Sequence, residues 1–204
     1  MNAPPRPLPD IAEPPRAART AMIAPLARAF ADDPAMAWIM PDPAVRAARL
    51  PKLFALLVDD EFASGWALAS PHSEAVTLWR SSETVHGSLW DLVRALPAFW
   101  SALGTNMPRG LAVSTAIDQH HPAGQAYDYL HFAGVDPAFQ GRGWGGAAIR
   151  AGLARAAARG RPVYLETATP ENVGLYMALG FAVIEEWDVP RGGPHFWSMW
   201  RDKY

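Results

Sequence analysis

The residues with the clearest chemical potential are the glycines within Gln140-Gly141-Arg142-Gly143-Trp144-Gly145-Gly146. They stand between an apolar run that ends at Val135 and an alanine-rich stretch of helical composition. Glycine tolerates positive φ and has no side chain, so several backbone N–H groups can converge in such a turn. The start of a helix adds its own unpaired N–H groups and the positive end of its dipole. The turn therefore predicts a binding site for phosphate.

The distribution of charge favours an anion at this turn. The chain has 204 residues, with 18 Lys and Arg against 20 Asp and Glu and a formal net charge of -2. No acidic residue lies between Asp136 and Glu166, yet five arginines do: Arg142, Arg150, Arg155, Arg159 and Arg161. Positive potential is thus concentrated on one turn and the helix after it. The alternative for the arginines of the helix is a solvated surface face.

Two phosphate-binding fingerprints fit these glycines. Gly141, Gly143 and Gly146 satisfy G-x-G-x-x-G, and Glu166 follows where a dinucleotide-binding fold places its ribose-binding acid. That interpretation leaves 64 residues from Gly141 to the last position, too few for both mononucleotide-binding halves. The other pattern is Q-x-x-G-x-G, which begins at Gln140. A Walker A loop is excluded because no Gly-Lys-Ser/Thr follows.

The second pattern resembles a known family. Val135-Asp136-Pro137 and the glycine cluster look like the acetyl-CoA pyrophosphate loop of the GNAT superfamily of N-acetyltransferases. The stretch from Asn172 to Phe181 resembles the superfamily's second signature, an Asn, a Tyr four residues later and then Gly-Phe. Tyr164-Leu165-Glu166-Thr167-Ala168, with the strands that follow, is more narrowly similar to the puromycin N-acetyltransferase branch. The similarity is strong over residues 125–204 and loose over residues 10–85.

The resemblance implies an α/β (α+β) fold. It would be a single GNAT-type domain with a mixed central sheet flanked by helices. The sheet would splay between the cofactor strand, which ends near Val135, and the next strand, residues 162–167. The pantetheine arm of acetyl-CoA would lie in that gap, along the main chain of Ala133 and Val135.

The same resemblance implies the remaining cofactor contacts. Pyrophosphate would lie on the backbone N–H groups from Gln140 to Gly146, the stretch that includes Gly141, Arg142, Gly143, Trp144 and Gly145. Asn172 and Tyr176, the first two residues of the second signature, would also lie at the cofactor.

Tyr176 is the predicted general acid. A phenol with a pKa of ~10 can protonate a departing thiolate whose conjugate acid has a pKa of ~8.5. The implied reaction is direct attack by a primary amine of a small molecule on acetyl-CoA, without a covalent enzyme intermediate. The alternative is that the ring of Tyr176 only packs its helix against the sheet.

The general base stays open at this point. Some GNAT enzymes carry a carboxylate on the cofactor strand, and Tyr129 occupies that position here. The substitutes within reach are His131, on the same face of that strand, and Glu166, on the neighbouring strand. Water that relays the proton to solvent is a further possibility.

The resemblance builds the acceptor site from the first loop and the last strands. Asp32, Asp33 and Trp38 come from that loop, Tyr129 from the cofactor strand, and His195-Phe196-Trp197 from the end of the chain. Two carboxylates beside an aromatic wall suit a cationic amine with an apolar body. Alternatively, the two aspartates cap a helix end and the tryptophan fills the core.

Apolar periodicity and turn residues predict the elements that position these groups. A proline-rich tail covers residues 1–9 and one domain covers residues 10–204. The predicted helices cover 20–32 with Thr20 as N-cap, 44–62, two pieces of 87–119 broken at 104–110, 145–158 and 171–179. The predicted strands are a short edge strand near residues 11–12, a hairpin of 65–69 and 75–80, then 126–135, 162–167, 181–189 and 196–200. Residues 32–43 are predicted as a loop.

Composition narrows the classes of function. The chain has no Cys, which excludes disulfides, thiolate metal sites and a Cys nucleophile. Neighbouring His120 and His121 would point their rings apart, so they predict a helix end or loop and no metal site. The near-neutral charge argues against a dedicated nucleic-acid binder. No apolar run approaches the ~18–20 residues that span a bilayer, so we expect a cytoplasmic protein without a membrane partner.

Three function classes remain from the sequence. The first is an acetyltransferase acting on a small-molecule amine, as a monomer or a homodimer. The second is a non-catalytic acyl-CoA-binding module on the same fold. The third is a nicotinamide-dependent oxidoreductase that uses the G-x-G-x-x-G pattern.

Overall fold

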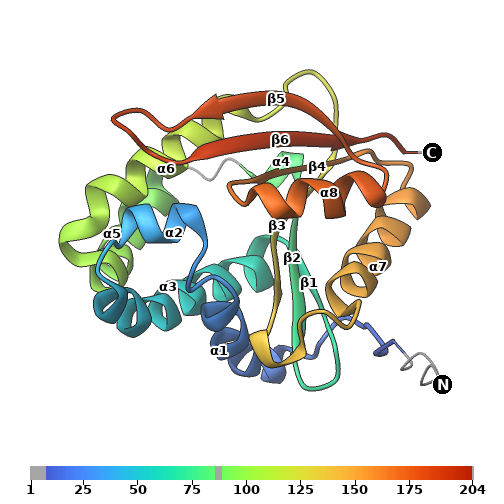
Figure 1. Cartoon of the computed structure of the whole chain (residues 1–204), viewed down its shortest axis with the longest axis horizontal. Coiled ribbons are helices and arrows are strands. Elements are labelled where there is room, and N and C mark those ends of the chain that lie inside the picture. The colour runs from blue at the N-terminus through green and yellow to red at the C-terminus, as the bar shows by residue number, and fades with distance from the viewer. Residues whose placement is uncertain (1–7, 86–88, 204) are drawn as a thin grey trace.

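One mixed sheet organises the chain (Figure 1). The computed structural model describes residues 8–85 and 89–203. Their six strands follow the order β1-β2-β3-β4-β6-β5. The strands are β1 (Trp66–Ala69), β2 (Ala75–Ser81), β3 (Asp128–Val135), β4 (Val163–Thr167), β5 (Ala182–Asp188) and β6 (His195–Arg201). Strands β3 and β4 are parallel, and the other neighbouring pairs are antiparallel.

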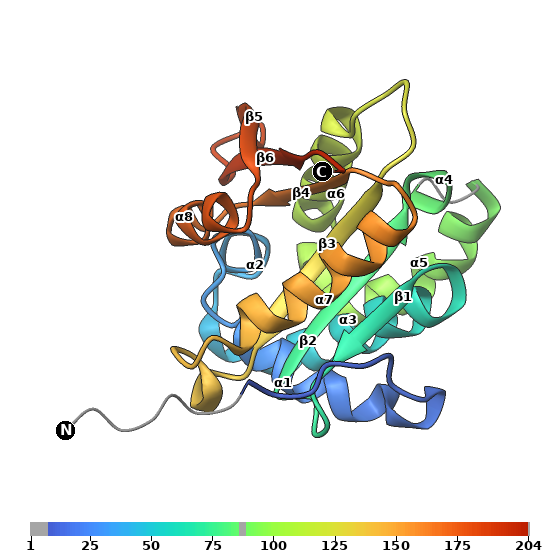
Figure 2. The same ribbon diagram turned by 90° about the vertical axis from the view of Figure 1, so that its right-hand side faces the viewer.

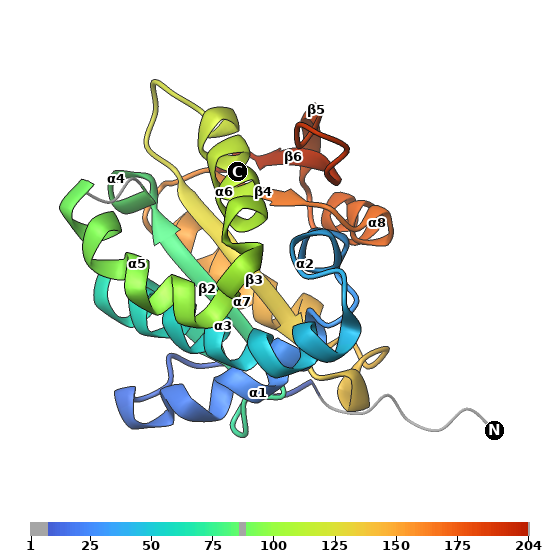
Figure 3. The same cartoon turned by 90° about the vertical axis from the view of Figure 1, so that its left-hand side faces the viewer.

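Helices cover both faces of this sheet. Figure 3 looks onto the face covered by α3, α5 and α6, and Figure 2 looks onto the opposite face, where α7 crosses β2 and β3. The helices are α1 (Arg19–Ala29), α2 (Pro34–Ile39), α3 (Pro43–Ser64), α4 (Ser82–Val85), α5 (Leu89–Leu103), α6 (Met107–His120), α7 (Trp144–Ala158) and α8 (Pro170–Ala178). Three single 3-10 turns stand at Arg16–Ala18, Gly104–Asn106 and Pro137–Phe139.

Each face has its own apolar core. On one face, residues of α1, α2, α3 and α6 pack on β1 and β2 around Leu26, Phe54 and Leu78, all 1% exposed or less. On the other face, α7 and α8 pack over Trp79 and Leu165. A Cβ at position 152 of α7 would lie 2.0 Å from the Trp79 ring, so only glycine lets this helix approach that closely.

The predicted fold class is confirmed: the chain forms a single α/β domain with a mixed open sheet flanked by helices. The interpretation as a doubly wound dinucleotide fold is wrong, because that fold needs a mostly parallel sheet and the described strands contain one parallel pair. The predicted hairpin and the last two strands are confirmed. The predicted edge strand is reduced to one bridge between Ala12 and Ala69.

The loop predicted over residues 32–43 is wrong in part. Asp33 begins helix α2 there, with its carboxylate accepting from Met36 N at 3.0 Å and Pro34 in the first turn. Thr20 is not an N-cap, because α1 begins at Arg19 and Ala18 precedes it. Of the tail predicted over residues 1–9, residues 1–7 lie outside the described part, as do residues 86–88 of the predicted helical stretch.

Across residues 8–85 and 89–203, no helix combines the length and the apolar composition that a membrane span requires.

Candidate active site

The parallel strands β3 and β4 pair over a short distance and then separate. Asp128 lies opposite Val163 and Tyr129 opposite Tyr164, and no further pair joins the two strands. Figure 2 shows β4 turning away from β3 beyond this point. A cavity of about 110 Å³ occupies the gap. The predicted site residues that line it are Asp33, Tyr129, His131, Ala133, Glu166, Asn172 and Tyr176.

A buried carboxyl group forms one wall of the cavity. The hydroxyl of Tyr129 donates a hydrogen bond to Glu166 Oε1, while the buried Oε2 has no partner among the described residues. Burial raises the pKa of Glu166 to about 8, although the bond from Tyr129 acts in the opposite direction. At neutral pH this carboxyl is therefore mostly protonated and can donate a hydrogen bond.

Tyr176 reaches the cavity from α8, which begins after the end of β4. Its side chain is buried, and its ring packs edge-on against Phe181. Its hydroxyl makes no hydrogen bond to another described residue, although it lines the cavity. Burial, followed by the nearby charges of Glu166 and Asp33, raises the pKa of this phenol. The hydroxyl is thus a protonated donor without an internal acceptor.

A bulge in β3 directs His131 toward the helices of the α3 face. Leu130 pairs with Trp79 and Phe132 pairs with Leu78, so His131 is an extra residue between two ladder pairs. Its ring lies 5.1 Å from the Tyr129 ring, on the strand face predicted from the sequence.

Sequence reasoning missed the partner of His131. The Nδ1 atom lies 2.5 Å from Oε1 of Glu61, a fully buried residue of α3. Arg80 Nε donates to the same oxygen at 2.8 Å. The available signal was that Glu61 continues the apolar stripe of its helix, three residues beyond the buried Val58.

The glycine turn presents unpaired backbone donors. Gly141 and Gly143 have φ of +72° and +79°, and Gly143 is the N-cap of α7. No N–H group from Gly141 to Gly146 donates to another described residue. The turn is held at its start by Gln140 Nε2, which donates to Val135 O at 3.1 Å. This backbone fits the phosphate cradle predicted from the sequence.

The charged side chains beside the turn make contacts within the protein that stabilise the turn. Asp136 accepts from Ala138 N at 3.1 Å and pairs with Arg28 of α1 at 2.5 Å. Arg142 donates to Ala138 O at 3.0 Å and lies over the Phe139 ring. Trp144 opens α7, so its backbone belongs to the first helical turn.

The structure separates the predicted acceptor residues. Asp33 lines the cavity, and burial raises the pKa of its carboxyl. Asp32 points into solvent with a fully exposed side chain. Trp38 packs against the core of the α3 face with Arg109 over its ring, and it does not line the cavity. From the last strand, Phe196 contributes to the cavity.

The two neighbouring histidines lie at the end of α6, as predicted. His120 stacks on Trp187 at 4.2 Å, whereas His121 packs against Tyr127 and Tyr129. Among the described residues, no group of three His, Asp or Glu side chains is arranged to hold a metal ion.

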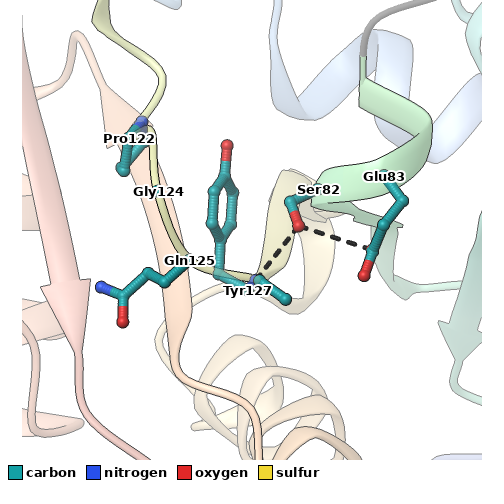
Figure 4. A pocket seen from close by; sticks show the side chains of 7 residues that line it. Ser82, Glu83, Pro122, Gly124, Gln125 and Tyr127 are labelled. Atoms are coloured by element: carbon teal, nitrogen blue, oxygen red, sulfur yellow. Dashed lines mark hydrogen bonds between the residues drawn. The ribbon is translucent and has the colours of Figure 1, made fainter.

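A second hollow lies at the start of β3, around the Tyr127 ring (Figure 4). Ser82 and Glu83 border it, and Figure 4 shows Gln125 on the other side of the ring. Glu83 is paired with Arg161, which lowers the pKa of the carboxyl to about 2. Ser82 Oγ accepts from Tyr127 N at 3.2 Å, so the hydroxyl and the carboxylate that border this hollow are both engaged in structure.

Comparison with known proteins agrees with this geometry. Residues 69–181 match the family model described as Acetyltransferase (GNAT) family. A crystal structure from Corynebacterium glutamicum, described as histone acetyltransferase HPA2 and related acetyltransferase, aligns with a TM-score of 0.72 at 25% identity and covers 96% of both chains.

Two structures of lower identity share the fold. Arylalkylamine N-acetyltransferase 2 from Aedes aegypti aligns at 13% identity and a TM-score of 0.61, over 96% of this chain and 99% of that one. A polyamine N-acetyltransferase from Drosophila melanogaster aligns at 14% identity and 0.56, over 95% and 99%. The chain therefore belongs to the acetyltransferase (GNAT) family and is an enzyme of the acetyltransferase class.

Proposed function

We propose that the protein transfers the acetyl group of acetyl-CoA to a primary amine of a small molecule, with Tyr176 as general acid. The observation that carries the proposal is Tyr176, a residue that lines the cavity between β3 and β4 and whose hydroxyl makes no hydrogen bond to another described residue. A general acid must be protonated and free to reach the leaving group. Burial keeps this phenol protonated, and the cavity gives it access.

The cofactor would be bound mainly by backbone. The unpaired N–H groups from Gly141 to Gly146 and the start of α7 suit the pyrophosphate. The main chain of Ala133 and Val135 lies beyond the last β3–β4 pair, where it has no strand partner on the β4 side. Acetyl-CoA would supply a thioester, whose carbonyl is activated by a correctly placed N–H donor. Asn172, on the first turn of α8, would border the same path.

The acceptor amine needs a base, and His131 is the residue that we propose. It lines the cavity, and its Nδ1 is already engaged by Glu61. Glu166 is less suited to this role, because a carboxyl with a pKa of about 8 is mostly protonated at neutral pH. We assign Glu166 and Tyr129 to acceptor positioning.

The cavity favours an amine with an apolar body. Asp33 supplies one carboxyl group, and aromatic and aliphatic side chains form the surrounding walls: Phe30, Met36, Val113, Ile117, Phe132 and Phe196. A primary ammonium beside Asp33 with its carbon skeleton along these walls satisfies both features. The two insect structures named above are described as an arylalkylamine and a polyamine N-acetyltransferase, and the sequence motif resembles the puromycin branch, so all three acceptor classes belong in the test.

A panel of amines tests the proposal. Purified protein, acetyl-CoA and one amine at a time (an arylalkylamine, a polyamine or puromycin) are followed by release of free thiol. We expect the arylalkylamine to give the highest kcat/KM. A rise in Tm with acetyl-CoA but no thiol release with any amine would favour the non-catalytic binding module.

A further inference from the structure

Glu61 is a buried carboxylate that the proposed reaction has not used. Its side chain is 0% exposed, at the last turns of α3. Both of its close partners are donors to one oxygen, Oε1: Arg80 Nε at 2.8 Å and His131 Nδ1 at 2.5 Å. Burying a charge is costly unless such partners compensate it. The two donors at Oε1 therefore compensate the buried charge of Glu61.

The backbone on both sides accommodates this contact. The bulge in β3 makes His131 the unpaired extra residue and places it next to Phe132, with ring centroids 4.2 Å apart. A Cβ at Gly65 would come within 2.3 Å of Glu61 Oε2, so the glycine after α3 leaves the space that the carboxylate occupies. The β3 bulge and the glycine after α3 thus both make room for the contact between Glu61 and His131.

The shared oxygen determines which ring nitrogen carries hydrogen. Arg80 Nε–H donates to Oε1, so that oxygen acts as an acceptor, and His131 Nδ1 must donate to it as well. In a neutral imidazole the other nitrogen, Nε2, then has a free lone pair. Nε2 makes no hydrogen bond to another described residue, while the ring borders the cavity.

We propose that Glu61 is a positioning residue, which holds His131 in the tautomer whose bare Nε2 accepts a proton from the acceptor amine. The inference rests on the proposed role of His131. As the amine nitrogen forms its bond to the acetyl carbon, one N–H proton moves to Nε2. The imidazolium so formed keeps its Nδ1–H bond to Glu61.

The spectrum of the wild-type protein tests the tautomer directly. Long-range proton–nitrogen correlations of ¹⁵N-histidine-labelled protein are recorded, and His131 is assigned by its loss in His131→Gln. We expect a protonated Nδ1 and a bare Nε2. A protonated Nε2 with a bare Nδ1 overturns the proposal, whatever the activity of the variants.

Three variants then show whether Glu61 acts by accepting the hydrogen bond of His131 or by its negative charge. Glu61→Leu removes the acceptor oxygen, and we expect kcat to fall ~10- to 100-fold with an unchanged KM for acetyl-CoA and a loss of the Nδ1–H preference. Glu61→Gln should restore that tautomer and most of kcat, because Arg80 and His131 both require an oxygen at the Oε1 position. Asp60→Asn is the matched control, since Asp60 pairs with Arg80 but not with His131.

The outcomes are distinct. The proposal is overturned if Glu61→Leu leaves both kcat and the His131 tautomer unchanged. It is also overturned if Asp60→Asn lowers kcat as much as Glu61→Leu does, because the loss would then come from the contacts of Arg80. If Glu61→Leu does not fold, the wild-type spectrum and Glu61→Gln decide. A wild-type protein with the expected tautomer but no acetyl transfer overturns the proposed function and leaves the pairing of Glu61 with His131 intact.

Discussion

The two ends of the β3–β4 pair differ in what holds the strands. At the paired end, Asp128 is fully buried and lies 3.3 Å from both Arg159 and Arg161, which follow α7. The aromatic rings of Tyr127 and Tyr164 pack edge-on beside it, 5.7 Å apart. Backbone pairing, ion pairs and aromatic packing hold the strands at this end, and Asp128 Oδ2, a buried oxygen without a hydrogen bond to a described residue, does not line the cavity.

At the separated end, the groups without partners belong to residues of the cavity and of the glycine turn. Glu166 Oε2 and the Tyr176 hydroxyl have no hydrogen bond to a described residue, and the turn after β3 presents unpaired N–H groups. Unsatisfied polar groups are costly in a protein interior, so a ligand that satisfies them gains affinity. One pair of strands thus contributes stability where it is joined and forms a candidate binding site where it separates.

Of the changes at the separated end, removal of the Tyr176 hydroxyl should lower kcat most strongly. In Tyr176→Phe we expect kcat to fall by ~10²–10⁴ with little change in acetyl-CoA binding, because only the proton donor is lost. Tyr127→Phe is the control at the paired end. That hydroxyl contacts His121 Nδ1 at 2.8 Å, so its loss should lower Tm and not kcat. Near-normal turnover in Tyr176→Phe, measured by thiol release, would refute the assignment.

A neutral residue at position 33 should weaken acceptor binding. Asparagine can still accept from Met36 N and cap α2, but it cannot pair with an ammonium group. A charged hydrogen bond is worth about 1.5–3 kcal/mol, so Asp33→Asn should raise the acceptor KM by roughly 10- to 100-fold and lower kcat less. Asp42→Asn, at the N-cap of α3, is the matched control. Equal KM values in both variants would exclude Asp33 from the acceptor site.

Two glycines that flank α7 allow cofactor binding to be tested separately from stability. Gly141 and Gly160 have φ of +72° and +64°, and a Cβ at either would meet no atom within 4 Å. Alanine in this left-handed region costs roughly 1–2 kcal/mol in both places. Gly141→Ala should also raise the KM for acetyl-CoA about 10-fold, since the loop distorts. Steady-state kinetics measure the KM for acetyl-CoA, and Tm measures the loss of stability. Equal KM values in Gly141→Ala and Gly160→Ala would show that the turn does not bind the cofactor.

The buried carboxyl of Glu166 should make stability depend on pH. Its pKa is about 8 in the folded protein against 4.5 when unperturbed, so between these pH values the folded state holds a proton that the unfolded state has released. The free energy of unfolding must therefore fall as pH rises from about 4.5 to about 8 and level off above that. Glu166→Gln lacks this titration. The Tm of the wild type should therefore fall relative to the Tm of the variant over this range, and a constant difference would contradict the shift.

Much of the fold could be predicted from the sequence because its signals are local. Apolar periodicity places α3 and α7, and the glycine turn identifies the strand before it and the helix after it. Helix α2 could have been found from Asp33-Pro34, an N-cap followed by proline, and from the apolar composition of residues 32–43, which is unusual for a loop.

The candidate site was less predictable because it depends on contacts between distant segments. Glu61 and His131 are 70 positions apart, and no short motif links them. Asp32 and Asp33 are neighbours of the same type, yet one is in solvent and the other is at the cavity. Only the position of the helix start decides which of them turns inward.

Because the proposed base His131 is the extra residue of the β3 bulge, it takes no part in the ladder of the sheet. If His131 were deleted, Leu130 would still lie opposite Trp79 and Phe132 opposite Leu78, with their side chains on alternate sides in an uninterrupted ladder. Excision of this single position should thus spare the architecture while abolishing proton removal. The strand carries its imidazole as an insertion, which gives a means of uncoupling folding from turnover by shortening the chain by one residue.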